Sequence, residues 1–252
     1  NPELTLMTPI ALDHVEILGN TLEKITKEKT GILKNNIPLI SAYQNPIVKR
    51  IIKKEARKKN CPVIFCKKDE KIILNNLKGE HQEKNAALAT NAVLALNIKN
   101  TSKEMILSSV LNTRWYGRYQ IIKNKPLVIF DVGHNEHGIK SFLKEYSKEI
   151  ISGKKYLIIA LQRRKKIDNI IEILKFEFDK IIFTQTSTRN SMNARILKNC
   201  FGKSNGLIIE NSENALSYCK NKLQKKDSLV ILGTHHLAES IQRVYKNSFD
   251  IL

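Results

Sequence analysis

One lysine of this sequence is expected to lie in an apolar setting, where its amine could do chemistry. Helix-like sequence runs from Thr21 to Leu33. Helical spacing groups four residues into one apolar face: Leu22, Ile25, Ile32 and Leu33. Lys29 falls in the middle of that face. A low-polarity setting disfavours the charged ammonium, and the neutral amine could react with carbon dioxide to form a carbamate, an anion able to help place a metal. The plainer alternative is a lysine stem that lies along the surface while its ammonium reaches water.

His14 is a second candidate for metal chemistry. It follows Asp13 in the loop after the first expected strand. A neutral imidazole there could be a direct ligand to the same metal ion. A single loop histidine is more often a hydrogen-bonding residue, so both interpretations stay open.

A polar cluster follows a buried strand in "FDVGHNEHG". Asp131, His134 and Asn135 come just beyond Phe130, and ligands of parallel sheets collect at the carboxyl ends of strands. Asp131 would be an acceptor suited to a sugar hydroxyl, and His134 would be a donor close by. An equally good interpretation is a turn whose side chains cap the next helix. The similar cluster "GTHHLAES", beyond Gly233, favours a loop and helix cap.

Two further residues are suited to a nucleotide. Asn85 lies in the first turns of a helix in "GEHQEKNAALA", where it could clamp a nucleobase or phosphate. Such polar residues are also typical of any helix N-terminus. Arg118, in "GRYQ", lies at an expected domain boundary, where it would face a phosphate and follow the closure of two domains. A lone arginine there is usually a surface residue.

The order of the strands and helices that must position these residues differs between the two halves of the chain. The first half predicts strands at 4–10, 37–42, 61–66 and 71–77 and helices at 21–33, 46–59, 81–97 and 102–111. The second half predicts five strands, each followed by a helix, beginning at 126, 155, 180, 206 and 228. Five such units in a row predict a doubly wound, mainly parallel sheet. The boundary is expected near residues 118–125, dividing the chain into 1–121 and 122–252.

Composition excludes some classes of protein. No apolar run approaches the length of a membrane span. The four cysteines form no C-x-x-C pair, so we expect reduced thiols in a cytoplasmic protein. The net charge of +19 could serve an anionic partner. However, aromatic residues are only 6%, and basic runs such as "KRIIKKEARKK" (49–59) have the spacing of outer helix faces. We therefore expect small-molecule partners, no nucleic acid and no membrane.

Taken together, four stretches closely resemble the folylpolyglutamate synthase/dihydrofolate synthase family of the Mur ligase superfamily. They are "LDHVEILGNTLEKITKEKTGI" (12–32), "GEHQEKNAALA" (79–89), "GRYQ" (117–120) and "DVGHNEHG" (131–138). The resemblance implies an α/β chain made of the C-terminal part of an ATPase domain (1–121) and a Rossmann-like domain (122–252). It also implies ATP-dependent amide formation between L-glutamate and dihydropteroate or a folate, through an acyl phosphate.

By motif, the resemblance also implies roles for individual residues. His14 corresponds to a Mg²⁺ ligand, and Lys29 to a carbamylated lysine. The positions that correspond to ATP contacts are Asn85, Arg118, Asp131 and His134. ATP and Mg²⁺ are thus the implied cofactors, and we expect a monomer.

The sequence departs from the family in ways that matter for activity. The Gly-Lys-Ser/Thr phosphate loop and the acidic Mg²⁺ ligand that precede "LDH" in the family are missing. Both would lie upstream of Asn1, so we expect a fragment, inactive alone, of an active ligase. Three alternatives stay open: a non-catalytic scaffold that kept the fold, another Mur-type amino acid ligase, and a nucleic-acid-binding protein. The sequence does not distinguish dihydrofolate synthesis from polyglutamate extension.

Overall fold

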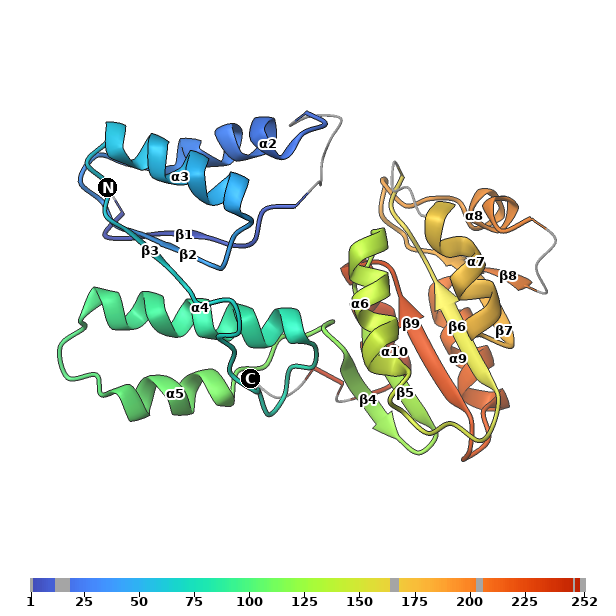
Figure 1. The fold of residues 1–252 in the computed structure, drawn as a ribbon. Helices are drawn as coiled ribbons and strands as arrows, with labels where there is room; N and C mark the ends of the chain where they lie inside the picture. Colours follow the sequence, from blue (N-terminus) through green and yellow to red (C-terminus); the bar gives the residue numbers. More distant parts are fainter. Residues whose placement is uncertain (1, 12–18, 164–167, 203–205, 247, 250–252) are drawn as a thin grey trace. The chain divides into compact units, whose positions relative to one another are not determined.

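The computed structural model describes residues 2–11, 19–163, 168–202, 206–246 and 248–249. The chain forms two compact units, Asn1–Thr113 and Arg114–Leu252 (Figure 1). This division falls ahead of the expected boundary between 121 and 122, because residues 114–121 pack with the second unit. No helix within the described ranges is long and apolar enough to cross a membrane.

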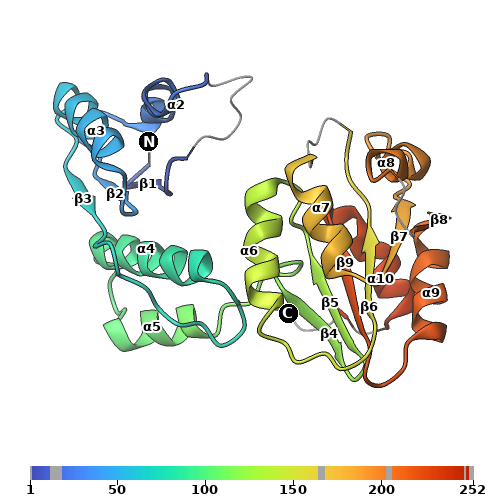
Figure 2. The same ribbon diagram turned by 45° about the vertical axis from the view of Figure 1, so that its right-hand side comes forward.

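Unit 1 is built on a small parallel sheet of three strands. The strands are β1 (Thr5–Met7), β2 (Leu39–Ser41) and β3 (Val63–Phe65), in that order. The helices are α2 (Leu22–Lys29), η1 (Thr30–Ile32), α3 (Pro46–Lys58), α4 (Glu80–Leu96) and α5 (Lys103–Leu111). Ile25 of α2 and Ile52 of α3 are buried against one face of the sheet, and Leu88 of α4 is buried against the other. Figure 2 shows α5 lying alongside α4.

Local signals explain where these helices begin. Asn45 caps α3 by accepting a hydrogen bond from the Ile47 N–H, and Pro46 is the first helical residue. Thr21 caps α2 in the same way. The strand predicted at 71–77 was wrong. The N–H of Ile72 donates to Glu83, and the N–H of Asn75 donates to Leu111, so these backbone groups bind helices instead of a neighbouring strand.

Unit 2 is a doubly wound sheet, which confirms the predicted fold class. Its strands are β4 (Gln120–Asn124), β5 (Leu127–Asp131), β6 (Lys155–Ile159), β7 (Lys180–Gln185), β8 (Gly206–Asn211) and β9 (Ser228–Leu232). Their spatial order is β4-β5-β9-β6-β7-β8. All neighbouring pairs are parallel except β4 with β5. The sequence did not predict β4.

Helices cover both faces of this sheet (Figures 1 and 2). One face carries α6 (Glu136–Tyr146), α7 (Asp168–Glu177) and α8 (Ala194–Cys200). The other face carries α9 (Ser212–Lys222), the short η2 (His235–Leu237) and α10 (Ala238–Val244). The central strand β9 is buried along its whole length, which is why its sequence reads as a continuous apolar run.

Candidate functional site

The end of strand β5 holds a buried carboxylate. Asp131 is 8% exposed. Its Oδ2 accepts from the N–H of Tyr119 at 2.8 Å, and its Oδ1 accepts from the N–H of Gly133 at 2.7 Å. Burial raises the pKa of the Asp131 carboxyl, while these two N–H groups and the nearby Arg118 charge oppose that rise. The carboxylate therefore organises the backbone on both sides of it.

A tight turn at 117–120 presents Arg118 beside this carboxylate. Gly117 and Tyr119 both have positive φ, 72° and 45°. Gly117 donates its N–H to Gln120 Oε1 at 2.9 Å, and its carbonyl accepts from the N–H of Val132 at 2.9 Å. The side chain of Arg118 is exposed. An exposed cation is thus placed on a turn whose backbone is held from both sides.

The residues after β5 begin helix α6. His134 Nδ1 lies 3.0 Å from the carbonyl oxygen of Val132. That contact favours the tautomer with a proton on Nδ1, which makes Nε2 an acceptor and not the donor that the sequence suggested. Asn135 caps α6 through the N–H of Gly138 at 2.8 Å. The predicted helix cap and the predicted polar cluster are therefore the same structure, and they do not exclude each other.

Strand β9 ends against the same cluster. The N–H of Gly233 donates to the carbonyl of Asp131 at 3.2 Å. Gly233 has φ +117°, and a Cβ there would lie 2.2 Å from the carbonyl oxygen of Ala160. Thr234 caps η2 by accepting from the His236 N–H at 3.3 Å, which confirms the loop-and-cap interpretation of "GTHHLAES".

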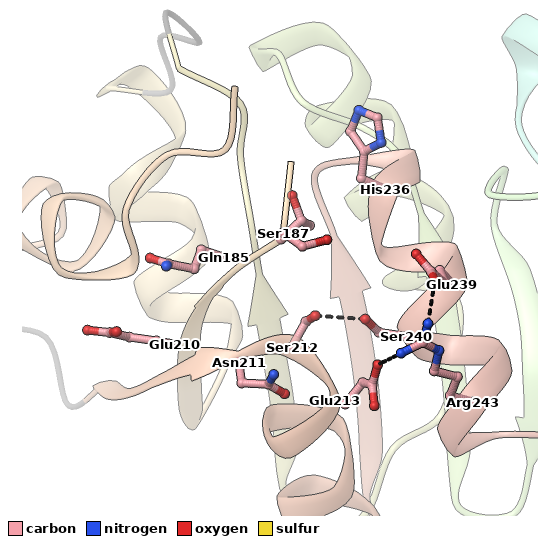
Figure 3. A pocket seen from close by; sticks show the side chains of 11 residues that line it. Gln185, Ser187, Glu210, Asn211, Ser212, Glu213, His236, Glu239, Ser240 and Arg243 are labelled. Carbon is pink, nitrogen blue, oxygen red and sulfur yellow. Dashed lines mark hydrogen bonds and ion pairs between the residues drawn. The ribbon is translucent and has the colours of Figure 1, made fainter. Parts of the chain in front are cut away.

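A groove of about 430 Å³ lies elsewhere on unit 2, at the carboxyl ends of β7 and β8 (Figure 3). The helices that follow these strands, α8 and α9, go to opposite faces of the sheet, an arrangement that opens a crevice at the strand ends. Every lining side chain is polar. Arg243 binds Glu213 and Glu239, and Ser212 Oγ lies 2.7 Å from Ser240 Oγ. These contacts join α9 to α10 and use much of the groove's hydrogen-bonding capacity.

The structure brings three of the predicted site residues together: Arg118, Asp131 and His134. All three lie in unit 2. Asn85 lies in unit 1, exposed on the second turn of α4, with its Nδ2 3.5 Å from Gln82 Oε1. His14 lies outside the described residues.

The expectation for Lys29 needs correction. Its side chain is exposed, and Ile32 is 45% exposed. Helix α2 ends at Lys29, so this residue stands at the end of the apolar face and not in its middle. A 3₁₀ turn follows, and it is Leu33 that enters the core, at 1% exposure.

Three residues of the cluster escaped the sequence reasoning: Tyr119, Gly133 and Gly233. Tyr119 contributes a backbone N–H, which no side-chain pattern reports. The glycines do carry a signal, since each follows or precedes a polar residue at a strand end. A glycine there indicates close backbone approach.

Comparison with known proteins defines the class. Residues 117–235, which contain the cluster and all six strands of the unit 2 sheet, match the family described as Mur ligase, glutamate ligase domain. Unit 2 is thus similar in sequence to the ligase domain that this family model describes.

Two curated relatives match nearly the whole chain. The dihydrofolate synthase/folylpolyglutamate synthase of Bacillus subtilis is 28% identical, over 97% of this chain and 63% of its own length. A probable dihydrofolate synthetase of Schizosaccharomyces pombe is 27% identical, over 97% of this chain and 66% of its own length. The resemblance to the folylpolyglutamate synthase/dihydrofolate synthase family is confirmed. The chain spans roughly three-fifths to two-thirds of these relatives.

Solved structures share the fold. Escherichia coli FolC in complex with DHPP and ADP has a TM-score of 0.79 at 22% identity, covering 96% of this chain and 61% of that one. Mycobacterium tuberculosis folylpolyglutamate synthase complexed with ADP has a TM-score of 0.81 at 20% identity, covering 98% of this chain and 64% of that one.

Proposed function

We propose that the chain is part of an ATP-dependent ligase that adds L-glutamate to dihydropteroate, to folates or to both. ATP would phosphorylate a carboxylate of the acceptor, the amino group of glutamate would attack the acyl phosphate, and an amide would form as phosphate leaves. The cluster of Arg118, Asp131 and His134, on a Mur-type ligase domain, is the observation that supports this most.

The geometry suggests a distinct task for each residue of the cluster. The exposed guanidinium of Arg118 is suited to offset charge on a phosphate, because it is planar and always protonated. Asp131 holds the turn that carries Arg118, and its oxygens retain acceptor capacity for a ribose hydroxyl. His134 would contact the nucleotide through Nε2. An exposed charge and a backbone held by hydrogen bonds are thus combined at one strand end.

The proposal extends by motif to unit 1, as the C-terminal portion of an ATPase domain. Asn85 is proposed as a nucleotide contact, His14 as a Mg²⁺ ligand and Lys29 as the carbamylation candidate. The part of the chain that the structure describes contains no group of three or more His, Cys, Asp or Glu suited to a metal. Mg²⁺ is proposed to arrive with ATP, and no step above depends on it. Carbon-13 NMR after labelled carbon dioxide would show whether Lys29 carries a carbamate.

We further propose a monomeric, cytoplasmic enzyme whose activity needs more of the protein than this chain.

One relative has a different acceptor: the diaminopimelate-adding muramoyl ligase of Buchnera aphidicola is 30% identical over 66% of this chain and 34% of its own length. A Mur-type ligase of that kind is the second candidate.

The test is phosphate release by the full-length native protein with ATP, Mg²⁺ and glutamate. Dihydropteroate, tetrahydrofolate and a nucleotide-linked muropeptide are supplied separately, and this chain is assayed alongside. Release that requires glutamate and a pterin acceptor is expected. Arg118→Gln should lower kcat/KM for ATP about tenfold or more, while Arg114→Gln, also exposed, should not. Phosphate release with the muropeptide alone would establish the second candidate. No phosphate release from folded full-length protein would favour the non-catalytic scaffold.

A further inference from the structure

Trp115 presents an indole ring to solvent close to the cluster at the end of β5. It is the only tryptophan of the sequence, and it is 68% exposed. Two exposed cations, Arg114 and Arg118, lie near it along the chain. Tryptophan is highly buried on average in folded proteins, and the ligase chemistry proposed above gives this ring no role.

The chain around Trp115 is held in place by the C-terminal residues of unit 2. The hydroxyl of Tyr116 donates to the carbonyl of Phe249 at 2.9 Å, and the two rings pack edge to face with centroids 5.2 Å apart. Gln120 Nε2 donates to the carbonyl of Ser248 at 2.8 Å. The ring of Tyr116 is thus tied to the body of unit 2, whereas the indole next to it is left on the surface.

Trp115 and Arg118 stand at the two ends of one tight turn. The central residues of the turn are Tyr116 and Gly117, and a φ of 72° at Gly117 is typical of the third position of a type II turn. The Cα atoms at the two ends of such a turn lie within about 7 Å of each other. Backbone hydrogen bonds fix the turn beside Asp131. The indole, the guanidinium and the buried carboxylate therefore project from one small region.

These three side chains complement the three parts of a nucleotide. Under the proposed function, Arg118 meets a phosphate and Asp131 meets a ribose hydroxyl. The base is bonded directly to the ribose, and it presents two flat faces whose hydrogen-bonding groups all lie on the rim. An indole is well suited to cover such a face, because stacking removes the surfaces of both rings from water.

A pterin is also flat, but the length of the acceptor disfavours it at this position. In dihydropteroate an aminobenzoyl group separates the pterin ring from the carboxylate that would react. If that carboxylate meets the phosphate beside Arg118, the pterin extends beyond a turn whose ends are about 7 Å apart. An adenine is one bond away from the sugar that Asp131 would hold, so the geometry favours the purine.

We propose that Trp115 stacks on the purine base of the bound nucleotide. This assignment rests on the proposed function for the nucleotide itself, and on the exposure of the indole and the geometry of the turn for the place of the base. The indole covers one face of the adenine, while Arg118 and Asp131 hold the phosphate and the sugar. Trp115 therefore adds affinity for the base and none for the phosphates.

The experiment measures the binding of ADP and of inorganic tripolyphosphate to the full-length native protein by calorimetry. Trp115→Ala should weaken ADP binding about tenfold or more, and should change tripolyphosphate binding by less than about twofold. Trp115→Phe keeps a flat ring, so it should retain most of the affinity for ADP. Trp115→Leu keeps apolar bulk without a flat aromatic face, so it should not.

Phe176 supplies a matched control. It is an exposed aromatic residue of the same unit, 89% exposed in the last turn of α7. Helix α7 follows the carboxyl end of β6 and runs back along the sheet, so its last turn lies at the edge opposite the cluster. Phe176→Ala should leave ADP binding within about twofold. Urea unfolding of this chain should be nearly the same for wild type and Trp115→Ala, because an exposed ring contributes little to the core.

Several results would overturn the proposal. Equal ADP affinity in wild type and Trp115→Ala would remove the base from this position, and full affinity in Trp115→Leu would show apolar packing without stacking. Equal weakening of ADP and tripolyphosphate would mean that the indole acts only by placing Arg118. Weaker dihydropteroate binding with unchanged ADP binding would assign the ring to the pterin. A wild-type full-length protein that binds no ADP would contradict the proposed function itself, which is a different failure.

Discussion

The backbone N–H of Tyr119 donates to Oδ2 of Asp131 over 2.8 Å, across twelve positions of sequence. Tyr119 adopts a left-handed conformation, with φ 45°, to make this contact. Arg118 is the residue immediately before it. A buried carboxylate on a strand thus determines where an exposed guanidinium stands.

Replacing Asp131 by Asn should lower the free energy of unfolding by about 1–3 kcal/mol. The amide offers one acceptor and one donor where two N–H groups need acceptors, so one buried N–H is left opposite an NH₂ group. Urea denaturation of this chain measures the change. Asp168→Asn, an exposed position on α7, should change stability by less than about 0.5 kcal/mol. Equal effects would show that Asp131 does not anchor the turn.

The Asp131 carboxyl should also titrate above its ordinary range. Burial raises its pKa in the folded chain, so between the unfolded and the folded pKa the native state holds more protons. Its contribution to stability is therefore greatest at low pH, and falls as pH rises through that window. The difference in unfolding free energy between wild type and Asp131→Asn, followed against pH, reports the sign. Carbon-13 NMR of the carboxyl gives the pKa directly, and a value below the ordinary range would contradict this account.

Gly117→Ala should destabilise the chain by about 1–3 kcal/mol. A Cβ there would lie 2.6 Å from Val132 Cγ1, and φ is +72°. Gly202 provides a matched control, because its φ is +58° and a Cβ would meet nothing within 4 Å. Gly202→Ala should cost only the backbone strain, about 1 kcal/mol. Thermal unfolding of both variants separates strain from collision, and equal losses would mean that Val132 moves aside freely.

The hydroxyls of Ser212 and Ser240 should behave as a coupled pair. Both are buried, and their oxygens are 2.7 Å apart. Ser212→Ala leaves the Ser240 hydroxyl without this partner, so we expect a loss of about 1–3 kcal/mol. The double Ala variant should lose less than the sum of the two single variants. A double-mutant cycle by urea denaturation measures this coupling; strict additivity would mean that the pair does not join α9 to α10.

Much of the fold could be predicted because it depends on local pattern. The five strand-helix units of residues 126–247 show as continuous apolar runs followed by amphipathic helices, and β5 to β9 are found where expected. A helix cap at Asn135 was one of the two interpretations that its place after a strand left open, and Asn135 does cap α6. Arg118, Asp131 and His134 were proposed as site residues by chemistry and by motif, and the structure places them at the end of one strand. In each case the information lies within a few residues.

Tertiary structure alone decided the rest, because it depends on contacts between distant segments. Strand β9 enters the sheet between β5 and β6, which brings Gly233 to the backbone of Asp131. Strand β4 forms only because β5 offers it an antiparallel edge. Lys29 shows the limit most clearly: spacing places it on an apolar face, but the helix ends there. Periodicity in the sequence predicts which side of a helix is apolar. Where that helix begins and ends is decided by its packing in the folded chain.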